Sequence, residues 1–396
     1  MTSLLETFRV FLRLGLTSFG GPVAHLGYFR EEFVVRRKWI DEKSFIDLVA
    51  LCQFLPGPSS SQVNLAIGLH RRGWSGALVA WLGFTLPSAI LMTAFGYGVG
   101  FLGDSIHSGW LAGLKLAATA VVAQAVWAMA TRFCSELSTA IIGIMGAIVA
   151  IVWQSSLNQL VIIALGLIIG CLLFHDQVKL SDSSSTRTLQ LNYGRRFGLG
   201  LLVLFFVLLL GLPILSSWLH IPLLSTFDSF YRAGSLVFGG GHVVLPLLKT
   251  AVVDPGWVDN NRFLAGYGVA QAVPGPLFSF AAYLGAIMGP NPHGCLGALW
   301  CLFALYVPAA LLIFGALPFW EKLRRQTGAQ AALKGANAAV IGILLAALYH
   351  PIWSTSVHNL KDFTLGLTAF IFLVLLKWPP WLVVTSSALA GWMFLR

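Results

Sequence analysis

The stretch Phe19-Gly20-Gly21-Pro22, followed by Pro56-Gly57-Pro58 in the same apolar region, decides the fold of this chain. Glycine and proline break helices, because glycine frees the backbone and proline removes a hydrogen-bond donor. The pair of signals returns as Phe238-Gly239-Gly240-Gly241 and Pro274-Gly275-Pro276. In lipid, a broken helix survives only where protein or a polar cavity satisfies the freed backbone groups. Two broken segments at corresponding places in two halves therefore indicate the central binding site of a transporter.

The composition of the 396 residues is that of a polytopic membrane protein. Hydrophobic residues make up 57% of the chain and charged residues only 10%, which is too apolar for a soluble protein of this length. The net charge of +10 does not indicate nucleic-acid binding, because the basic residues fall in short loops between apolar stretches. The five cysteines show no Cys-x-x-Cys spacing, so we expect core residues. We expect no cleavable leader, since Arg9 and Arg13 interrupt the first apolar stretch.

The two halves of the chain match each other at an offset of about 219 residues, as from Phe19 to Phe238. So many matches in the same order indicate duplication rather than chance. We therefore predict two homologous domains, residues 1–175 and 218–396. The aligned pairs include Arg13/Arg232, Trp39/Trp257, Asp41/Asp259, Phe45/Phe263, Gln53/Gln271, Pro87/Pro308, Leu114-Lys115/Leu333-Lys334 and Val121/Val340.

Apolar stretches beyond the broken segments are the expected membrane spans. Several are shorter than the ~20 residues of a straight crossing, so their ends are approximate. They lie at 75–99, 108–130, 139–153 and 157–174 in the first half, and at 294–316, 331–349, 363–376 and 380–395 in the second.

The segment between the halves, residues 176–217, reads as a polar cytoplasmic loop followed by an unpaired apolar span from Phe197 to about Leu215. If each half crosses the membrane an even number of times, this extra helix inverts the second half relative to the first. Charge placement agrees, because residues 30–43 hold five basic residues and the corresponding residues 249–262 hold two. We predict an all-α membrane protein with two inverted homologous halves, broken or re-entrant helices and a linking transmembrane helix.

The broken segments can be full crossings or re-entrant hairpins that turn at their Gly/Pro tips. Full crossings would place the basic loop of residues 30–43 outside, against the positive-inside rule. Hairpins would place that loop, Arg71, Arg72, Arg132 and the central loop in the cytoplasm. We favour the hairpins, with a cytoplasmic N-terminus.

The polar run after Pro58 is the strongest candidate for a binding site. Proline at a helix start, followed by hydroxyl residues, presents unpaired N–H groups and a partial positive charge, which together favour an anion. The second-half tip keeps Ser279 but is otherwise apolar, so we expect the first tip to bind and the second to shape the cavity. A packing kink is the plain alternative for each tip. The predicted substrate-binding residues are Arg13, Gly20, Gly21, Pro56, Gly57, Pro58, Ser59, Ser60, Ser61, Gln62, Asn64, Arg232, Gly239, Gly240, Gln271, Pro274, Gly275, Pro276 and Ser279.

Charged residues within apolar stretches form a second group of candidates, because they are costly in a membrane unless they serve a cavity or reach the interface. Arg13 and Arg232 could attract an anion. Lys115 and Lys334 could take part in proton or charge coupling, or extend toward the membrane surface. His25, Asp47 and His242 could carry protons or be satisfied core groups.

Motifs of enzymes are absent from the sequence. There is no Walker loop, no His-Glu-x-x-His, no Gly-x-Ser-x-Gly and no cysteine/histidine metal spacing. We therefore expect no catalytic residues, no metal and no cofactor.

The motifs resemble those of the chromate ion transporter family, in its two-domain, long-chain prokaryotic form. The resemblance covers nearly the whole chain. It rests on Phe19-Gly20-Gly21-Pro22-x-x-His25, Trp39, Gln53-x-x-Pro56-Gly57-Pro58, Gln62, Gly68, Pro87-Ser88, Phe238-Gly239-Gly240-Gly241-His242, Gln271-x-x-Pro274-Gly275-Pro276 and Pro308.

This resemblance implies a multi-pass protein of the cytoplasmic (inner) membrane that exports chromate and confers chromate resistance. The membrane potential, the proton motive force or both would drive it. The expected partners are chromate or a similar oxyanion and the lipid bilayer, and a homodimer is possible. Nucleic acid is not an expected partner. A sulfate or other oxyanion permease is the alternative, and a membrane sensor or scaffold without transport is a second one.

Overall fold

The computed structural model describes residues 3–101, 109–153, 158–175, 193–238, 243–323 and 326–395, and every regular element in these ranges is helical. The first half contains α1 (Leu4–Thr17), α2 (Gly21–Arg30), the π-helical turn η1 (Glu31–Arg36), α3 (Glu42–Phe54), α4 (Ser59–Phe101), α5 (Gly109–Phe133), α6 (Leu137–Val152) and α7 (Asn158–Phe174). The linking helix is α8 (Arg195–Leu219). The second half contains α9 (Pro222–Ser235), α10 (Val244–Val252), α11 (Asn260–Ala272), η4 (Leu277–Ser279), α12 (Phe280–Ile287), α13 (Gly294–Ala316), η5 (Leu317–Phe319), α14 (Trp320–Leu323), α15 (Thr327–Ala347), η6 (Leu348–Trp353), α16 (Ser354–Ser356), α17 (Leu360–Val374) and α18 (Pro380–Phe394).

The expected membrane spans correspond to helices. Among the described residues, five helices are long and apolar enough to cross a membrane: α4, α5, α8, α13 with its continuation to Leu323, and α15 with its continuation to Ser356. α6, α7 and α18 are apolar but shorter, at 16, 17 and 15 residues. The predicted class, an all-α polytopic membrane protein, is confirmed.

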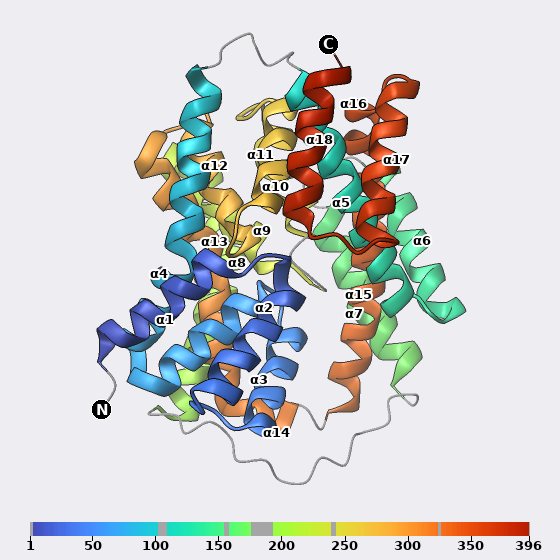
Figure 1. Cartoon of the computed structure of the whole chain (residues 1–396). Coiled ribbons are helices and arrows are strands. Elements are labelled where there is room, and N and C mark those ends of the chain that lie inside the picture. Colours follow the sequence, from blue (N-terminus) through green and yellow to red (C-terminus); the bar gives the residue numbers. More distant parts are fainter. Residues whose placement is uncertain are drawn as a thin grey trace.

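The first half folds as two hairpins that turn at the Gly/Pro tips. α1 runs from the N-terminal end of the molecule to its centre, and α2 with η1 returns to that end (Figure 1). α3 runs to the centre again, and the first part of α4 returns as far as Arg72. Gly73, with φ of 64° and ψ of −152°, then reverses the chain, and the rest of α4 continues to the opposite end.

Contacts at the N-terminal end place the basic loop beside the other basic segments. The Arg71 guanidinium lies 4.5 Å from the ring centroid of Trp39, and Arg37 bonds Glu6 of α1 at 3.1 Å. Tyr193, just before α8, donates to the carbonyl of Phe314 at the end of α13. The loop therefore lies at the same end as the N-terminus, the start of α8 and the end of α13 (Figure 1). The side of the membrane that this end faces stays a prediction.

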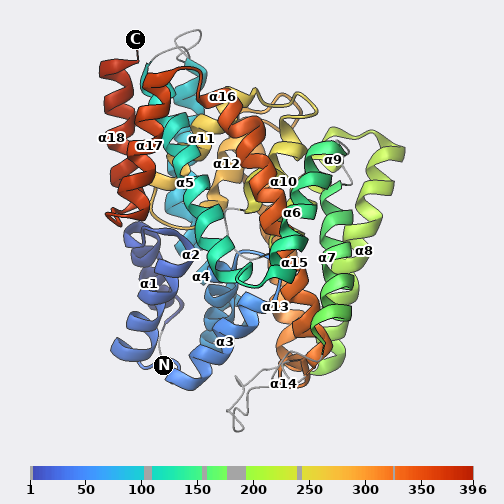
Figure 2. The ribbon, with the colours of Figure 1, turned by 90° about the vertical axis from the view of Figure 1, so that its right-hand side faces the viewer.

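The second half places its own broken helices at the opposite end. α9, α10, α11 and α12 gather there with the C-terminus (Figures 1 and 2). The long helices are exchanged between the halves, since α5 packs against α17 and α18 while α15 packs against α6 and α7. Glycines permit these close approaches, as at Gly113 against the Ser387 carbonyl and at Gly335 against Gly166. The reciprocal packing supports the prediction of inverted halves, which stays a prediction as regards the membrane.

α8 stands apart from this exchange. It packs against α9 and α13, and only 17% of its most apolar stretch of 18 residues is buried within the protein. An apolar helix of 25 residues with so much exposed surface suits contact with lipid hydrocarbon. This is the unpaired helix that the sequence placed between the halves.

Candidate functional site

The Gly/Pro tips of the two halves bond to each other at the centre of the molecule. The backbone N–H of Gly57 donates to the carbonyl of Val237 at 2.7 Å, and that of Gly275 donates to the carbonyl of Ser18 at 2.9 Å. Gly57 has a φ of 117° and Gly275 a φ of 97°, which glycine adopts without strain. Each half thus satisfies a backbone donor that the helix break freed in the other.

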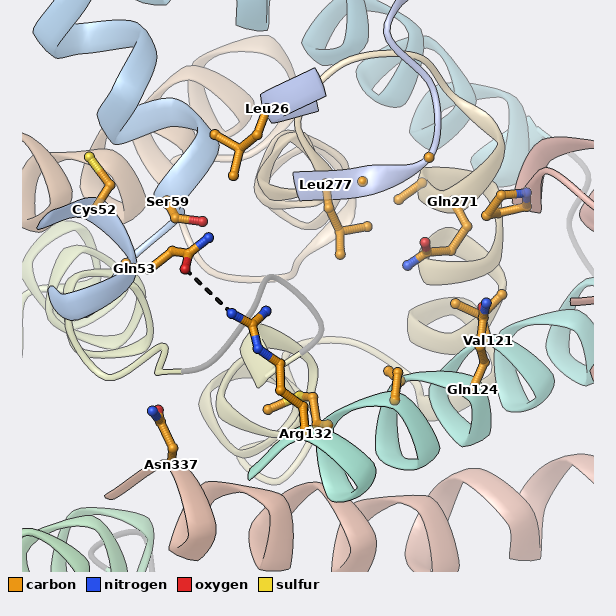
Figure 3. A pocket seen from close by; sticks show the side chains of 18 of the residues that line it. Leu26, Cys52, Gln53, Ser59, Val121, Gln124, Arg132, Gln271, Leu277 and Asn337 are labelled. Atoms are coloured by element: carbon orange, nitrogen blue, oxygen red, sulfur yellow. Dashed lines mark hydrogen bonds between the residues drawn. The ribbon is translucent and has the colours of Figure 1, made fainter. Parts of the chain in front are cut away.

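A cavity of about 450 Å³ opens beside these tips, within the size range of small-molecule binding sites. Three of the four tips reach it, through Gly20 and Gly21, Gly57, and Gly275. The fourth tip, residues 239–242, lies outside the described residues. The side chains that line it with polar groups are Gln53, Ser59, Gln124, Arg132, Gln271 and Asn337 (Figure 3).

Arg132, in the last turn of α5, supplies the positive charge of the cavity. Its guanidinium points into the cavity and bonds the Gln53 side-chain oxygen weakly, at 3.5 Å (Figure 3). It also lies 5.1 Å from the ring centroid of Phe133. Among the described residues that line the cavity there is no carboxylate, so this charge is not neutralised locally. An uncompensated guanidinium with free donors favours an anion.

Further donors face the same space. Gln271 lines the cavity, and Figure 3 shows its amide directed into that space. Ser59 lies in the first turn of α4, where backbone N–H groups have no partner within the helix. The helix dipole adds a partial positive charge at this end. Guanidinium, amide and helix N-terminus together form a site suited to an oxyanion.

Only part of the predicted site lines the cavity. The predicted residues that do so are Gly20, Gly21, Gly57, Ser59, Gln271 and Gly275. The prolines that flank the tip glycines, Pro56, Pro58, Pro274 and Pro276, shape the turns without lining the space.

The rest of the polar run lies around the other faces of α4. Ser60, Ser61, Gln62 and Asn64 are all buried and none of them lines the cavity. The Ser60 hydroxyl is 3.4 Å from Nδ1 of His25, and the Gln62 amide donates to the Pro56 carbonyl at 2.9 Å. These side chains therefore hold the tip in place. Ser279 of the second half is buried as well.

The two aligned arginines, Arg13 and Arg232, do not line the main cavity. Arg13 lies on an exposed face of α1. Arg232 forms an ion pair of 2.8 Å with the buried carboxylate of Asp228, four residues earlier, and lines a separate hollow of about 140 Å³. The predicted residues Gly239, Gly240 and His242 lie outside the described residues.

The two aligned lysines bridge the halves. Lys115 of α5 donates to the side-chain oxygen of Asn261 at the start of α11, at 3.1 Å. Lys334 of α15 forms an ion pair of 2.7 Å with Glu136, which precedes α6. Of the other candidates for coupling, His25 is fully buried, its ring edge-on to Phe84, and Asp47 is half-buried on α3.

Sequence reasoning missed the central cation. Arg132 falls just beyond the expected span 108–130, and the position 219 residues later is Pro351, so the repeat gave no signal for it. Gln53 carried a usable signal, because its partner in the repeat is Gln271 and both line the cavity. For Gln124 and Asn337 the sequence repeat offered no such signal.

An all-helical membrane protein in which broken helices from two halves surround a central cavity with polar side chains has the architecture of a secondary transporter. The chain belongs to the chromate transporter family, whose family model matches residues 5–171 and 224–392. It is accordingly a transporter and not an enzyme.

Relatives extend over nearly the whole chain. A probable chromate transport protein of Synechococcus elongatus is 27% identical over 99% of this chain and 96% of its own length. A chromate transport protein of Pseudomonas aeruginosa is 26% identical over 98% and 92%. An uncharacterized transporter of Methanocaldococcus jannaschii is 28% identical over 87% and 83%. No solved structure matches this chain.

Proposed function

We propose that the protein carries chromate through the central cavity. The observation that supports this most strongly is the Arg132 guanidinium, which faces the N-terminus of α4 across a cavity without a carboxylate among its described lining residues. Two relatives of nearly full length are named as chromate transport proteins or probable ones. Chromate is a tetrahedral dianion, and charged donors that converge on one space suit it.

The proposed direction is export across the inner membrane of a prokaryote, which would confer chromate resistance. A dianion that leaves a cell with a negative interior gains roughly 7 kcal/mol at ~150 mV, from about 2.3 kcal/mol per charge per 100 mV. The potential could therefore drive export alone. His25, buried beside Ser60 at the first-half tips, is the proposed site for any added proton coupling.

The test is chromate uptake into inside-out membrane vesicles. Arg132→Gln should raise KM roughly tenfold to a hundredfold, because a hydrogen bond to a charged group contributes about 1.5–3 kcal/mol. Arg132→Lys should retain part of the binding. Arg196→Gln, at an exposed position in the first turn of α8, is the matched control and should leave KM unchanged. An unchanged KM in Arg132→Gln would remove the proposed site.

Competing anions test whether chromate is the substrate, and ionophores test which gradient drives transport. Sulfate and molybdate should compete weakly if chromate is the substrate, and sulfate flux without chromate flux would make the protein a sulfate permease. Collapse of the potential should abolish uptake, whereas collapse of the pH gradient alone should not. If the pH gradient proves necessary, proton coupling replaces the potential as the drive.

A further inference from the structure

α11 packs tightly against α5 at the C-terminal end of the molecule. A Cβ atom on Gly268 would stand 2.7 Å from the carbonyl oxygen of Leu114, and Ala265 lies in the same apolar cluster as Leu114. The bond from Lys115 to Asn261 joins the same two helices. Both helices also line the cavity, so this interface lies directly beside it.

The corresponding helices at the N-terminal end, α3 and α15, make no comparable packing, although both are described along their whole length. Ile46 on α3 is 57% exposed, whereas its counterpart Leu264 on α11 is 1% exposed. Ala50 is exposed, whereas its counterpart Gly268 is buried against α5. The face of α3 that matches the docked face of α11 is thus uncovered.

We propose that this face of α3 docks on α15 in a second conformation of the transporter, while α11 separates from α5. The helices at the N-terminal end would then close over the cavity, and those at the opposite end would part. The two interfaces join related helices in duplicated halves, and this structure holds one of them. Because Ala50 carries the Cβ that Gly268 lacks, α3 would dock on α15 less closely than α11 docks on α5. The inference rests on the proposed transport function, because only a transporter needs both conformations.

Charged residues on α3 and beside α15 suit this docking. Lys334 corresponds to Lys115, and Lys43 corresponds to Asn261, so docking would bring two ammonium groups together. Asp47 lies one helical turn beyond Lys43 on the same face of α3. Glu136 already pairs with Lys334 at 2.7 Å. In the docked state Asp47 would add a second carboxylate, so that two carboxylates would balance the ammonium groups of Lys43 and Lys334. Asp47 is thus a positioning residue for the docked state of α3. Its counterpart on α11 is the apolar residue Ala265.

A pair of cysteines at Ala50 and Leu333, the counterparts of Gly268 and Leu114, tests the docking. The full-length protein carries both substitutions with its five native cysteines replaced. A disulfide needs Cα atoms within about 7 Å, so only the docked conformation allows it. Oxidation should cross-link most molecules and lower chromate uptake at least tenfold, and reduction should restore uptake. Leu345→Cys, about 18 Å further along α15, replaces Leu333→Cys in the control pair and should not cross-link.

Asp47→Lys should slow cross-linking of the Ala50/Leu333 pair by roughly twofold to fivefold, the effect of one ion pair near a surface. Asp47→Ala should slow it less. The docking is overturned if the reduced pair transports normally yet never cross-links, or if the cross-linked protein still transports. Cross-linking in a protein that moves sulfate but not chromate would support the docking and overturn only the proposed substrate.

Discussion

Gly57 and Gly275 make the backbone hydrogen bonds that join the tips of the two halves, and their positive φ angles favour glycine over any other residue. With a φ of 117°, Gly57 occupies a region that other residues enter at a cost of about 1–3 kcal/mol. An added Cβ would also stand 2.9 Å from the Gln62 amide nitrogen, which braces the tip. We expect Gly57→Ala to lower the thermal unfolding temperature of the detergent-solubilised protein by several degrees.

Gly275→Ala should behave alike, since its φ is 97° and its Cβ would stand 3.0 Å from the Ser88 hydroxyl. Gly211→Ala on α8 is the matched control, because open space surrounds it. That substitution should leave the melting temperature equal or slightly higher, as alanine favours helix. If all three variants melt alike, the tips are not under the conformational constraint described.

Arg232 has a structural partner, so its substitution should act on stability first. Asp228 has a side-chain exposure of 4%, and removal of Arg232 would leave a buried carboxylate without its cation. We expect Arg232→Gln to destabilise the protein by about 3 kcal/mol, and Arg232→Gln with Asp228→Asn to recover much of that loss. Thermal unfolding of both variants and of Asp228→Asn measures the coupling. A loss of transport without a loss of stability would instead favour a direct role in anion attraction.

Arg132 shows what repetition in a sequence cannot reveal. The repeat identified residues that occur in both halves, such as Gln53 and Gln271, because duplication preserved them. Arg132 has Pro351 at the corresponding position, so it belongs to one half only. Its place in the cavity follows from the packing of α5 between helices of the other half, which no local pattern encodes.

At the scale of elements, α3 and α11 begin in the same way. Asp41 accepts from the backbone N–H of Ser44 at 3.0 Å, and Asp259 accepts from the N–H groups of Asn261 and Arg262. Both aspartates are helix caps that the duplication kept. We expect Asp41→Ala to cost about 1 kcal/mol in unfolding free energy, and Asp41→Asn less, because asparagine also caps.

The capping contribution of Asp41 should vanish in acid. The hydrogen bond from the Ser44 backbone N–H, followed by that from the Ser44 hydroxyl, lowers the pKa of Asp41. A lowered pKa in the folded state means that the stabilisation is present above the unfolded value of about 3.9 and is lost as the pH falls through the folded value. The difference in melting temperature between wild type and Asp41→Ala should therefore be constant above about pH 5 and shrink below about pH 4. A difference that persists at pH 2 would show that the carboxylate is not the source.

Element boundaries were predictable where glycine, proline and capping residues mark them. α4 begins at Ser59 directly after Pro58, and its reversal at Gly73 precedes the span expected from residue 75. The face of a helix that meets the cavity was not predictable. Of the polar run in the first turns of α4, Ser59 lines the cavity while Ser60 and Ser61 are buried against neighbouring helices. Helical twist distributes such a run around the axis, and tertiary packing decides which residue is exposed.

At the scale of the whole molecule, the two sets of broken helices occupy opposite ends and meet at the tips (Figure 1). The reciprocal bonds of Gly57 and Gly275 mean that neither half can form its own tip completely. The cavity therefore arises only when both halves are folded together. This is why the sequence predicted tips and a central site but not its walls.

The two ends of the molecule should face opposite sides of the membrane. Arg36→Cys lies in η1 at the N-terminal end, and Pro255→Cys lies in the turn after α10 at the opposite end, both at exposed positions. The excess of basic residues around Arg36 predicts the cytoplasm for that end. In intact cells, a membrane-impermeant maleimide should label Pro255→Cys at once and Arg36→Cys only after permeabilisation. Labelling of both from outside would mean that the first hairpin crosses the membrane, and protection of both would mean that the halves are not inverted.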